Sequence, residues 1–96
     1  MYVHIVLYRW KENVTKDRIN KILQAIRQLK GKITGLIDIM CGENFSPYSD
    51  GFTHAIVVIA EDADALQRYK DHPTHRELAD EIEKMEERGI GLDFKA

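Results

Sequence analysis

The sequence predicts an α+β domain with the element order β-α-β-β-α-α-β and a four-stranded antiparallel sheet. Its 96 residues match one domain of common size, so we assign residues 1–96 to a single domain. The shares of apolar residues, 44%, and of charged residues, 31%, are those of an ordinary folded chain. Apolar residues recur at strand spacing in some segments and at helical spacing in others, and these periods define the elements below.

The first strand and the first helix open the chain. Residues from Tyr2 to Trp10 are mostly β-branched or aromatic and predict a strand with two largely apolar faces. One face carries Val3, Ile5 and Leu7, and the other carries His4, Val6 and Tyr8. The segment around Thr15 supplies a helix cap. An amphipathic helix follows, because apolar residues repeat at helical spacing: Ile19, Ile22, Leu23, Ile26 and Leu29.

Two further strands follow, separated by a polar loop. Gly31 and Gly35 bracket the end of the first helix, and Leu36 to Gly42 alternates as a second strand. The segment 43–51 is rich in turn-forming residues, although Phe45 and Tyr48 predict that it packs down on the domain. Phe52 to Ala60 is the most strongly patterned strand, again with two apolar faces.

The remaining chain predicts two helices and a last short strand. Asp62 can cap a short helix, and Pro73 marks the first turn of another. The inward stripe of this third helix is His75, Leu78, Ala79, Ile82 and Met85, and Gly89 can end it. Alternation of Ile90, Leu92 and Phe94 then indicates the final strand. The complete order is that of a ferredoxin-like protomer with a divided second helical arm.

The two-faced strands predict a homodimer. Helices of such a fold cover one face of the sheet, so the second apolar face needs another cover, most simply the same face of a second copy. One candidate interface combines residues of the first and third strands: Val3, Ile5, Leu7, Thr53, Ala55, Val57 and Ile59.

Composition disfavours several classes of partner. A formal net charge of −2 lacks the basic footprint of nucleic-acid binding. The apolar N-terminal stretch is too short to span a bilayer and is interrupted by His4 and Arg9, so we expect no membrane insertion. The single Cys41 cannot form an internal disulfide, which favours the reducing cytoplasm. Because no phosphate loop or nucleophile elbow occurs, we expect no cofactor.

Four histidines are the candidate chemical groups. His4 and His54 fall on the same apolar face of their strands, although each alone is often a satisfied structural imidazole. His75 faces inward at the start of the third helix, where the helix dipole favours the neutral ring. Tyr69 could present its hydroxyl to the same space or simply pack. The pair His72 and His75 has metal-ligand spacing, but without a third ligand we expect no metal and interpret His72 as a cap.

Four segments then identify a family resemblance: His4-Ile5-Val6-Leu7, Gly42-Glu43-Asn44-Phe45-Ser46, Gly51-Phe52-Thr53-His54-Ala55 and Tyr69-x-x-His72-Pro73-x-His75. Together they resemble the stress-responsive dimeric α/β-barrel (Dabb) family. The resemblance implies a ferredoxin-like protomer that closes a dimeric α/β barrel with a second copy. The family includes plant stress proteins without a known reaction and a cofactor-free polyketide cyclase.

The resemblance to the cyclase also implies roles for individual residues. His75 would be the general base, with His4 and Tyr69 orienting or polarising a carbonyl group. The pocket would be lined by Val6, Tyr8, Ile22, Ile26, His54 and Ile56. Ile22 and Ile26 stand where the cyclase has aromatic residues, and Tyr8 stands where it has an aliphatic one, so the substrate would differ.

Three functions remain open at this point. The first is binding of a small apolar carbonyl or aromatic compound, with cofactor-free acid–base chemistry of a cyclase or lyase type. The second is a non-catalytic role in the stress response, in which the barrel only holds the dimer together. The third is the cofactor-free monooxygenase or haem-degrading activity that related dimeric barrels host. The sequence names no ligand.

Overall fold

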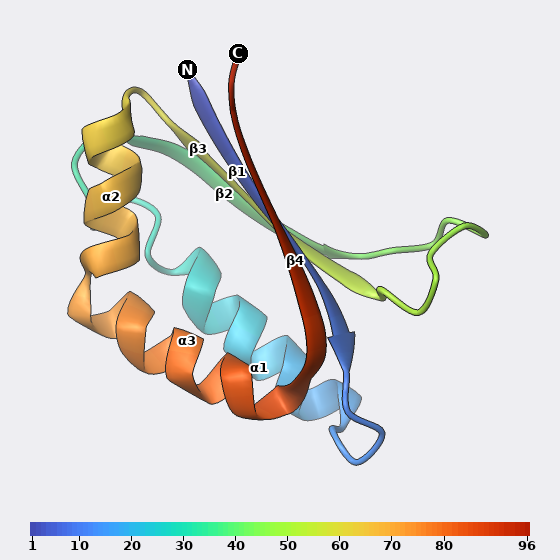
Figure 1. Cartoon of the computed structure of the whole chain (residues 1–96). Helices are drawn as coiled ribbons and strands as arrows, with labels where there is room; N and C mark the ends of the chain where they lie inside the picture. The colour runs from blue at the N-terminus through green and yellow to red at the C-terminus, as the bar shows by residue number, and fades with distance from the viewer.

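A computed structural model describes residues 1–96 and contains seven elements in the predicted order (Figure 1). The strands are β1 (Tyr2–Trp10), β2 (Leu36–Glu43), β3 (His54–Ala60) and β4 (Glu86–Lys95). The helices are α1 (Lys16–Arg27), α2 (Ala63–Asp71) and α3 (Pro73–Met85). The predicted ferredoxin-like α+β protomer with its β-α-β-β-α-α-β order is therefore confirmed.

The four strands form one antiparallel sheet in the order β2-β3-β1-β4. Strand β1 is central, and its His4 pairs with Val58 of β3 on one side and with Asp93 of β4 on the other. Tyr8 pairs with His54 and with Gly89. Because side chains alternate between faces, His4, Val6 and Tyr8 share one face with Ile56 and Val58.

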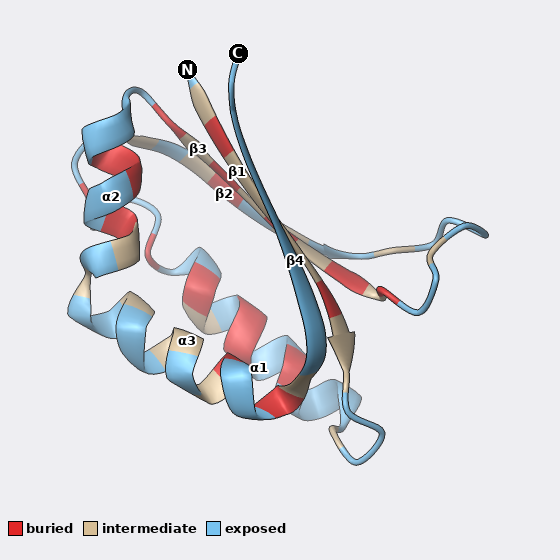
Figure 2. Cartoon of the chain, in the orientation of Figure 1, coloured by how far each residue is buried: buried red, intermediate tan, exposed pale blue.

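All three helices cover that face (Figure 1). Figure 2 shows the buried residues on the helix surfaces that face the sheet and along the sheet itself. The core contains the predicted stripe of α1, together with Val58 and Ala60 of β3 and Met85 of α3, all almost completely buried. Burying large aliphatic side chains stabilises a fold by about 1.5–3 kcal/mol each. The helix layer is consequently fixed to this face of the sheet.

The helices begin at the predicted caps. Thr15 Oγ1 accepts a hydrogen bond from the backbone N–H of Arg18 at 3.2 Å, and Asp62 Oδ1 accepts one from Ala65 at 2.8 Å. His72 ends α2 and caps α3, because its Nδ1 accepts from the backbone N–H of Thr74 at 3.1 Å. Each cap satisfies a donor that the first turn of a helix leaves free.

The last helix ends earlier than the sequence predicts. Helix α3 ends at Met85, and Glu86 already has an extended backbone with φ −78° and ψ 138°. Gly89 therefore lies within β4, paired with Tyr8, and does not end the helix. Pairing with β1 overrides the helical pattern of the preceding charged residues, because β4 gains a ladder of backbone hydrogen bonds along nearly its whole length. Strand β3 in turn begins at His54, two residues later than predicted.

The loop between β2 and β3 also differs from expectation. It projects away from the rest of the molecule (Figure 1). Phe45 and Tyr48 are 96% and 91% exposed, so they do not pack down on the domain. Asn44 nevertheless braces the loop base, where its Nδ2 donates to the carbonyl oxygen of Phe52 at 2.8 Å.

The second face of the sheet has no helix on it. Val3, Ile5 and Leu7 of β1 share this face with Ala55, Val57 and Ile59 of β3, as their register requires. Strand β4 adds Ile90, Leu92 and Phe94, which are 41%, 54% and 45% exposed. This open face is a continuous apolar surface within one chain. None of the helices is long and apolar enough to cross a membrane.

Candidate functional site

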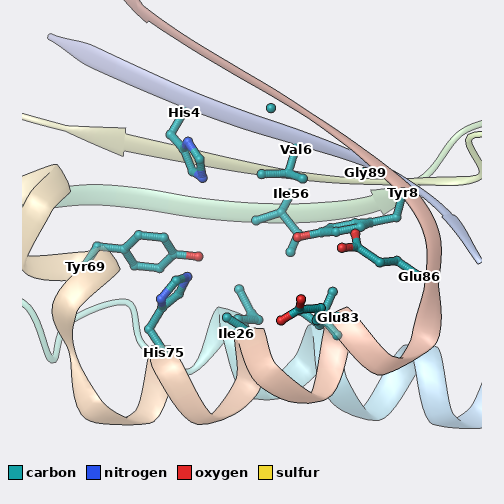
Figure 3. A pocket seen from close by; sticks show the side chains of 13 residues that line it. His4, Val6, Tyr8, Ile26, Ile56, Tyr69, His75, Glu83, Glu86 and Gly89 are labelled. Carbon is teal, nitrogen blue, oxygen red and sulfur yellow. The ribbon is translucent and has the colours of Figure 1, made fainter.

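A cavity of about 330 Å³ lies between the sheet and the helices (Figure 3). This volume is at the lower end of the range of small-molecule sites. Every strand except β2 and all three helices contribute to its wall. The lining residues are His4, Val6, Tyr8, Ile26, Ile56, Tyr69, His75, Ala79, Ile82, Glu83, Glu86, Gly89 and Gly91.

His75 stands at the start of α3 with one ring nitrogen held by the backbone. Its Nδ1 lies 3.0 Å from the carbonyl oxygen of Lys70. A carbonyl oxygen only accepts, so Nδ1 carries the proton and Nε2 keeps its lone pair. Burial is the largest cause that lowers the pKa of His75, opposed by the bond to Lys70. The imidazole is therefore neutral near pH 7 and available as a base.

His4 is oriented from the neighbouring strand. Its Nδ1 hydrogen-bonds to Oδ1 of Asp93, the residue directly opposite on β4. Lys70 Nζ binds the other oxygen of that carboxylate at 3.0 Å. The bond to His4, followed by that to Lys70, lowers the pKa of Asp93, which stays ionised. Asp93 thus fixes the tautomer and the ring orientation of His4, as carboxylates do for functional histidines.

Tyr69 of α2 lies between the two imidazoles. Its ring centroid is 4.3 Å from that of His75 and 6.2 Å from that of His4. The side chain is 2% exposed, and its hydroxyl points into the cavity (Figure 3). Burial raises the pKa of Tyr69, so the phenol remains a protonated donor at neutral pH. A base, a phenol and an oriented imidazole consequently converge on one end of the cavity.

This arrangement suits proton transfer at a carbon beside a carbonyl group. The free Nε2 of His75 could accept a proton from the substrate, and the Tyr69 hydroxyl could donate a hydrogen bond to the oxygen where negative charge develops. Apolar side chains on the same wall, such as Val6, Ile26 and Ile56, could contact the rest of such a substrate. The geometry fits a ligand with one polar carbonyl end.

Two predicted lining residues lie elsewhere. Ile22 of α1 is 7% exposed and belongs to the packed core, not to the cavity wall. Ile22 lies about one helical turn before Ile26, so the two side chains contact different parts of the sheet. His54 shares the face of His4 but is paired with Tyr8, whereas His4 is paired with Val58. Four residues of strand separate these positions, roughly 13 Å at the usual rise.

His54 has its own set of partners. Its Nδ1 accepts a hydrogen bond from Trp10 Nε1 at 3.0 Å, and Thr53 Oγ1 lies 2.8 Å from the same nitrogen. An indole N–H only donates, so Nδ1 is the unprotonated nitrogen. Burial is the largest cause that lowers the pKa of His54. The ring borders a separate hollow of about 150 Å³ that also involves Asn20, Arg27 and Glu43.

Several cavity residues escaped the sequence analysis. Glu83, Glu86, Gly89 and Gly91 line the wall, and Asp93 holds His4. One signal in the sequence could have found some of them. Ile90, Leu92 and Phe94 alternate on one face of the last strand, so Gly89, Gly91 and Asp93 must lie on the other face. Their nearness to His4 depends on the register of β4 against β1, which no local pattern encodes.

The two histidines at the start of α3 each use one ring nitrogen in a hydrogen bond within the chain. His72 is the cap described above, and His75 is bound to Lys70 through Nδ1. No group of three or more histidine, cysteine, aspartate or glutamate side chains is arranged to hold a metal ion.

Fold and cavity together define a ferredoxin-like domain with a small cavity between its sheet and its helices. The profile of the stress-responsive A/B barrel domain family matches residues 3–96. The chain belongs to this Dabb family.

Similar proteins include both uncharacterised and enzymatic members. An uncharacterised protein of Streptomyces coelicolor is 36% identical over 78 residues, which is 79% of this chain and 80% of that protein. Olivetolic acid cyclase of Cannabis sativa is 22% identical over 95% of this chain and 92% of its own length. A solved structure from Thermobifida fusca, described as a dimeric ferredoxin-like protein of unknown function, has 26% identity and a TM-score of 0.87, covering 99% of this chain and 90% of that one.

Proposed function

We propose that the protein binds a small apolar carbonyl compound in the cavity and catalyses cofactor-free proton transfer on it. In this proposal His75 is the general base, Tyr69 polarises the carbonyl oxygen, and His4 orients the substrate. Val6, Tyr8, Ile26 and Ile56 contact the apolar part of the ligand. A cyclase among the relatives makes acid–base chemistry on carbonyl carbon a reasonable class of reaction.

One observation carries the proposal: the backbone holds His75 in the tautomer that a base requires. The bond from Nδ1 to Lys70 leaves Nε2 as the only free acceptor of the ring. Had Nδ1 accepted a hydrogen bond, as in His54, the remaining nitrogen would carry a proton and could not act as a base. The lowered pKa of His75 keeps this nitrogen unprotonated at neutral pH.

Proton exchange tests the proposal without knowledge of the natural substrate. The probe is 4-propylacetophenone in D₂O, and the rate of deuterium incorporation at the methyl group beside the carbonyl is followed by NMR. We expect the protein to accelerate exchange above an equal concentration of imidazole, and His75→Ala to lower the rate by about 10²–10⁴-fold.

The outcome separates catalysis from binding. If the ketone binds but exchanges no faster than with free imidazole, the catalytic proposal fails. A non-catalytic binding role would then replace it.

We also propose a homodimer in which the open faces of two sheets pack together and close an α/β barrel. Exposed apolar side chains on one continuous sheet face usually mark an interface. Leu92 lies on this face in the edge strand β4, where it pairs with Ile5 of β1, and it is 54% exposed. A related structure is described as dimeric. With no strong charge and one cysteine, we propose the cytoplasm as the location.

Molar mass in solution tests the dimer. Wild type should have twice the mass of one chain by light scattering at micromolar concentration. Leu92→Asp should give monomers, because a buried unpaired carboxylate is costly at an apolar interface. Thr74→Asp adds the same charge at the exposed start of α3 and should stay dimeric. A monomeric wild type would contradict this proposal.

A further inference from the structure

The two ends of the cavity differ in chemistry. His4, Tyr69 and His75 form the donor and base end described above. Glu83, from the last turn of α3, and Glu86, the first residue of β4, place their carboxylates at the other end, near Tyr8 (Figure 3). Glu83 is exposed and Glu86 is half-buried, so this acidic end is the side of the cavity that opens to solvent.

The two carboxylates have no cation of their own. None of the ion pairs in the chain includes Glu83 or Glu86, and no lysine or arginine lines the cavity. Burial raises the pKa of Glu86, and the charge of Glu83 adds to this effect. Two uncompensated carboxylates three residues apart repel each other, which costs stability. A positive charge between them would relieve that repulsion.

The hydroxyl of a buried tyrosine also points into the space between the two ends. Tyr8 is 8% exposed, and its phenolic oxygen faces the cavity (Figure 3). No hydrogen bond within the chain involves this oxygen, although a buried phenol usually has a partner. Tyr8 therefore presents an unused donor and acceptor to a ligand, independently of the two glutamates.

The backbone makes room for the carboxylate of Glu86. A Cβ atom at Gly89 would lie 2.5 Å from Glu86 Oε2 and 3.6 Å from Tyr8 Cε1. Glycine at this position lets the carboxylate lie against the strand beside the Tyr8 ring. The backbone of β4 at Gly89 therefore leaves space for the carboxylate at the acidic end of the cavity.

We propose that the ligand is a carbonyl compound with a protonated amine at the end distant from the carbonyl, and that Glu83, Glu86 and Tyr8 bind this ammonium group. The inference rests on the proposed function, because the carbonyl end is assigned to His4, Tyr69 and His75. An ammonium group donates three hydrogen bonds, and carboxylate and phenolic oxygens accept them. A ligand with a carboxylate at the same end would meet two like charges and be rejected.

Three ketones that share a 4-ethylacetophenone skeleton and differ in the terminal group test this selectivity. They are 4-(2-aminoethyl)acetophenone, the uncharged 4-propylacetophenone and 3-(4-acetylphenyl)propanoic acid, titrated calorimetrically at pH 7. We expect the amine to bind at least tenfold more tightly than the uncharged ketone, and the acid to bind most weakly. The double variant Glu83→Gln/Glu86→Gln should abolish the preference for the amine over the acid.

A matched control separates local from general electrostatics. Glu77→Gln/Asp80→Asn removes the same formal charge from exposed positions of α3 that do not line the cavity, and it should keep the preference. Equal binding of amine and uncharged ketone, or an unchanged preference in Glu83→Gln/Glu86→Gln, would overturn the inference and leave the proposed function standing. Failure of all three ketones to bind would overturn both.

Discussion

His4 and His54 lie on the same face of the same sheet, and the comparison between them separates a histidine that borders the main cavity from one that is held in a local hydrogen-bonded cluster. His4 is held by a carboxylate on an adjacent strand and borders the larger cavity. His54 receives a hydrogen bond from Trp10 and borders a smaller hollow at the far end of the strands. A shared face therefore does not make a shared site, because position along the strand decides which helix lies above each imidazole.

The comparison extends to the tautomers. His75, beside His4, donates through Nδ1 to a carbonyl oxygen and keeps Nε2 free. His54 accepts at Nδ1, so its proton is on Nε2. The free ring nitrogen of His75 is therefore unprotonated and could accept a proton. The free ring nitrogen of His54 carries the proton, and its other nitrogen is occupied by Trp10. The partner atom decides the difference, not the pKa, which is lowered in both.

Replacing each strand histidine should break the comparison most clearly. We expect His4→Ala to lower the exchange rate of 4-propylacetophenone by about 10²-fold, the usual loss when a substrate is no longer held in its reactive position. His54→Ala should leave this rate within twofold. Equal losses in the two variants would show that both histidines belong to one site. The rates are measured by NMR, as for His75→Ala.

Stability should show the reverse order. His54→Ala removes the acceptor of the Trp10 indole N–H, and an unsatisfied donor of this kind costs about 1–3 kcal/mol. His4→Ala removes a hydrogen bond to the half-exposed Asp93, and a side-chain contact of this exposed kind contributes only about 0–1 kcal/mol. Urea denaturation of both variants measures the two free energies. A larger loss in His4→Ala would contradict the structural role given to His54.

Adding the same side chain inside and outside the cavity should sharpen the contrast. A Cβ atom at Gly91 or at Gly42 would meet nothing within 4 Å. Gly91 lines the main cavity, so Gly91→Val should weaken ketone binding at least tenfold, or about 1.4 kcal/mol. Gly42→Val is the control, because Gly42 pairs with Ala55 and its added side chain lies on the open face; this variant should keep the affinity. Unchanged binding in Gly91→Val would place the ligand outside the cavity.

The smallest expected effect is a pH dependence common to both regions. The folded-state pKa values of His54 and His75 lie below the unfolded value of about 6.5, so the unfolded chain binds more protons as the pH falls. Their stabilisation is complete above about pH 7 and is lost as the pH decreases through the lowered folded values. The raised pKa of Glu86 acts in the opposite direction at lower pH.

Denaturation at pH 7.5 and 5.5 should detect this loss. Wild type should be less stable at pH 5.5, and His54→Asn and His75→Asn should each reduce the difference. Glu86 is present in every variant, so its contribution cancels in the comparison. An undiminished difference in the combined His54→Asn/His75→Asn variant would assign the pH dependence to other groups.

The sequence predicts the architecture better than the chemistry. The bounds of β1 and the caps at Thr15, Asp62 and His72 follow from local rules, since alternation and capping depend on neighbouring residues. The inward direction of His75 and Tyr69 follows from helical spacing. Asp93, Glu83 and Glu86 could not be placed, because their positions depend on strand register and on where β4 begins, and both are set by pairing with a distant strand.

The pairing of β1 with β4 also affects when the cavity forms during folding. His4 and Asp93 are 89 positions apart in sequence, and the N–H of Ala96 donates to the carbonyl oxygen of Met1 at 2.8 Å. Contacts between such distant segments require a large loop to close, and this slows folding. A chain in which only the first three strands have assembled already has His4, Tyr8 and much of its core, but it lacks one wall of the cavity. The cavity is complete only after β4 has paired with β1. Binding of a ligand in the cavity would therefore measure how many chains have completed folding.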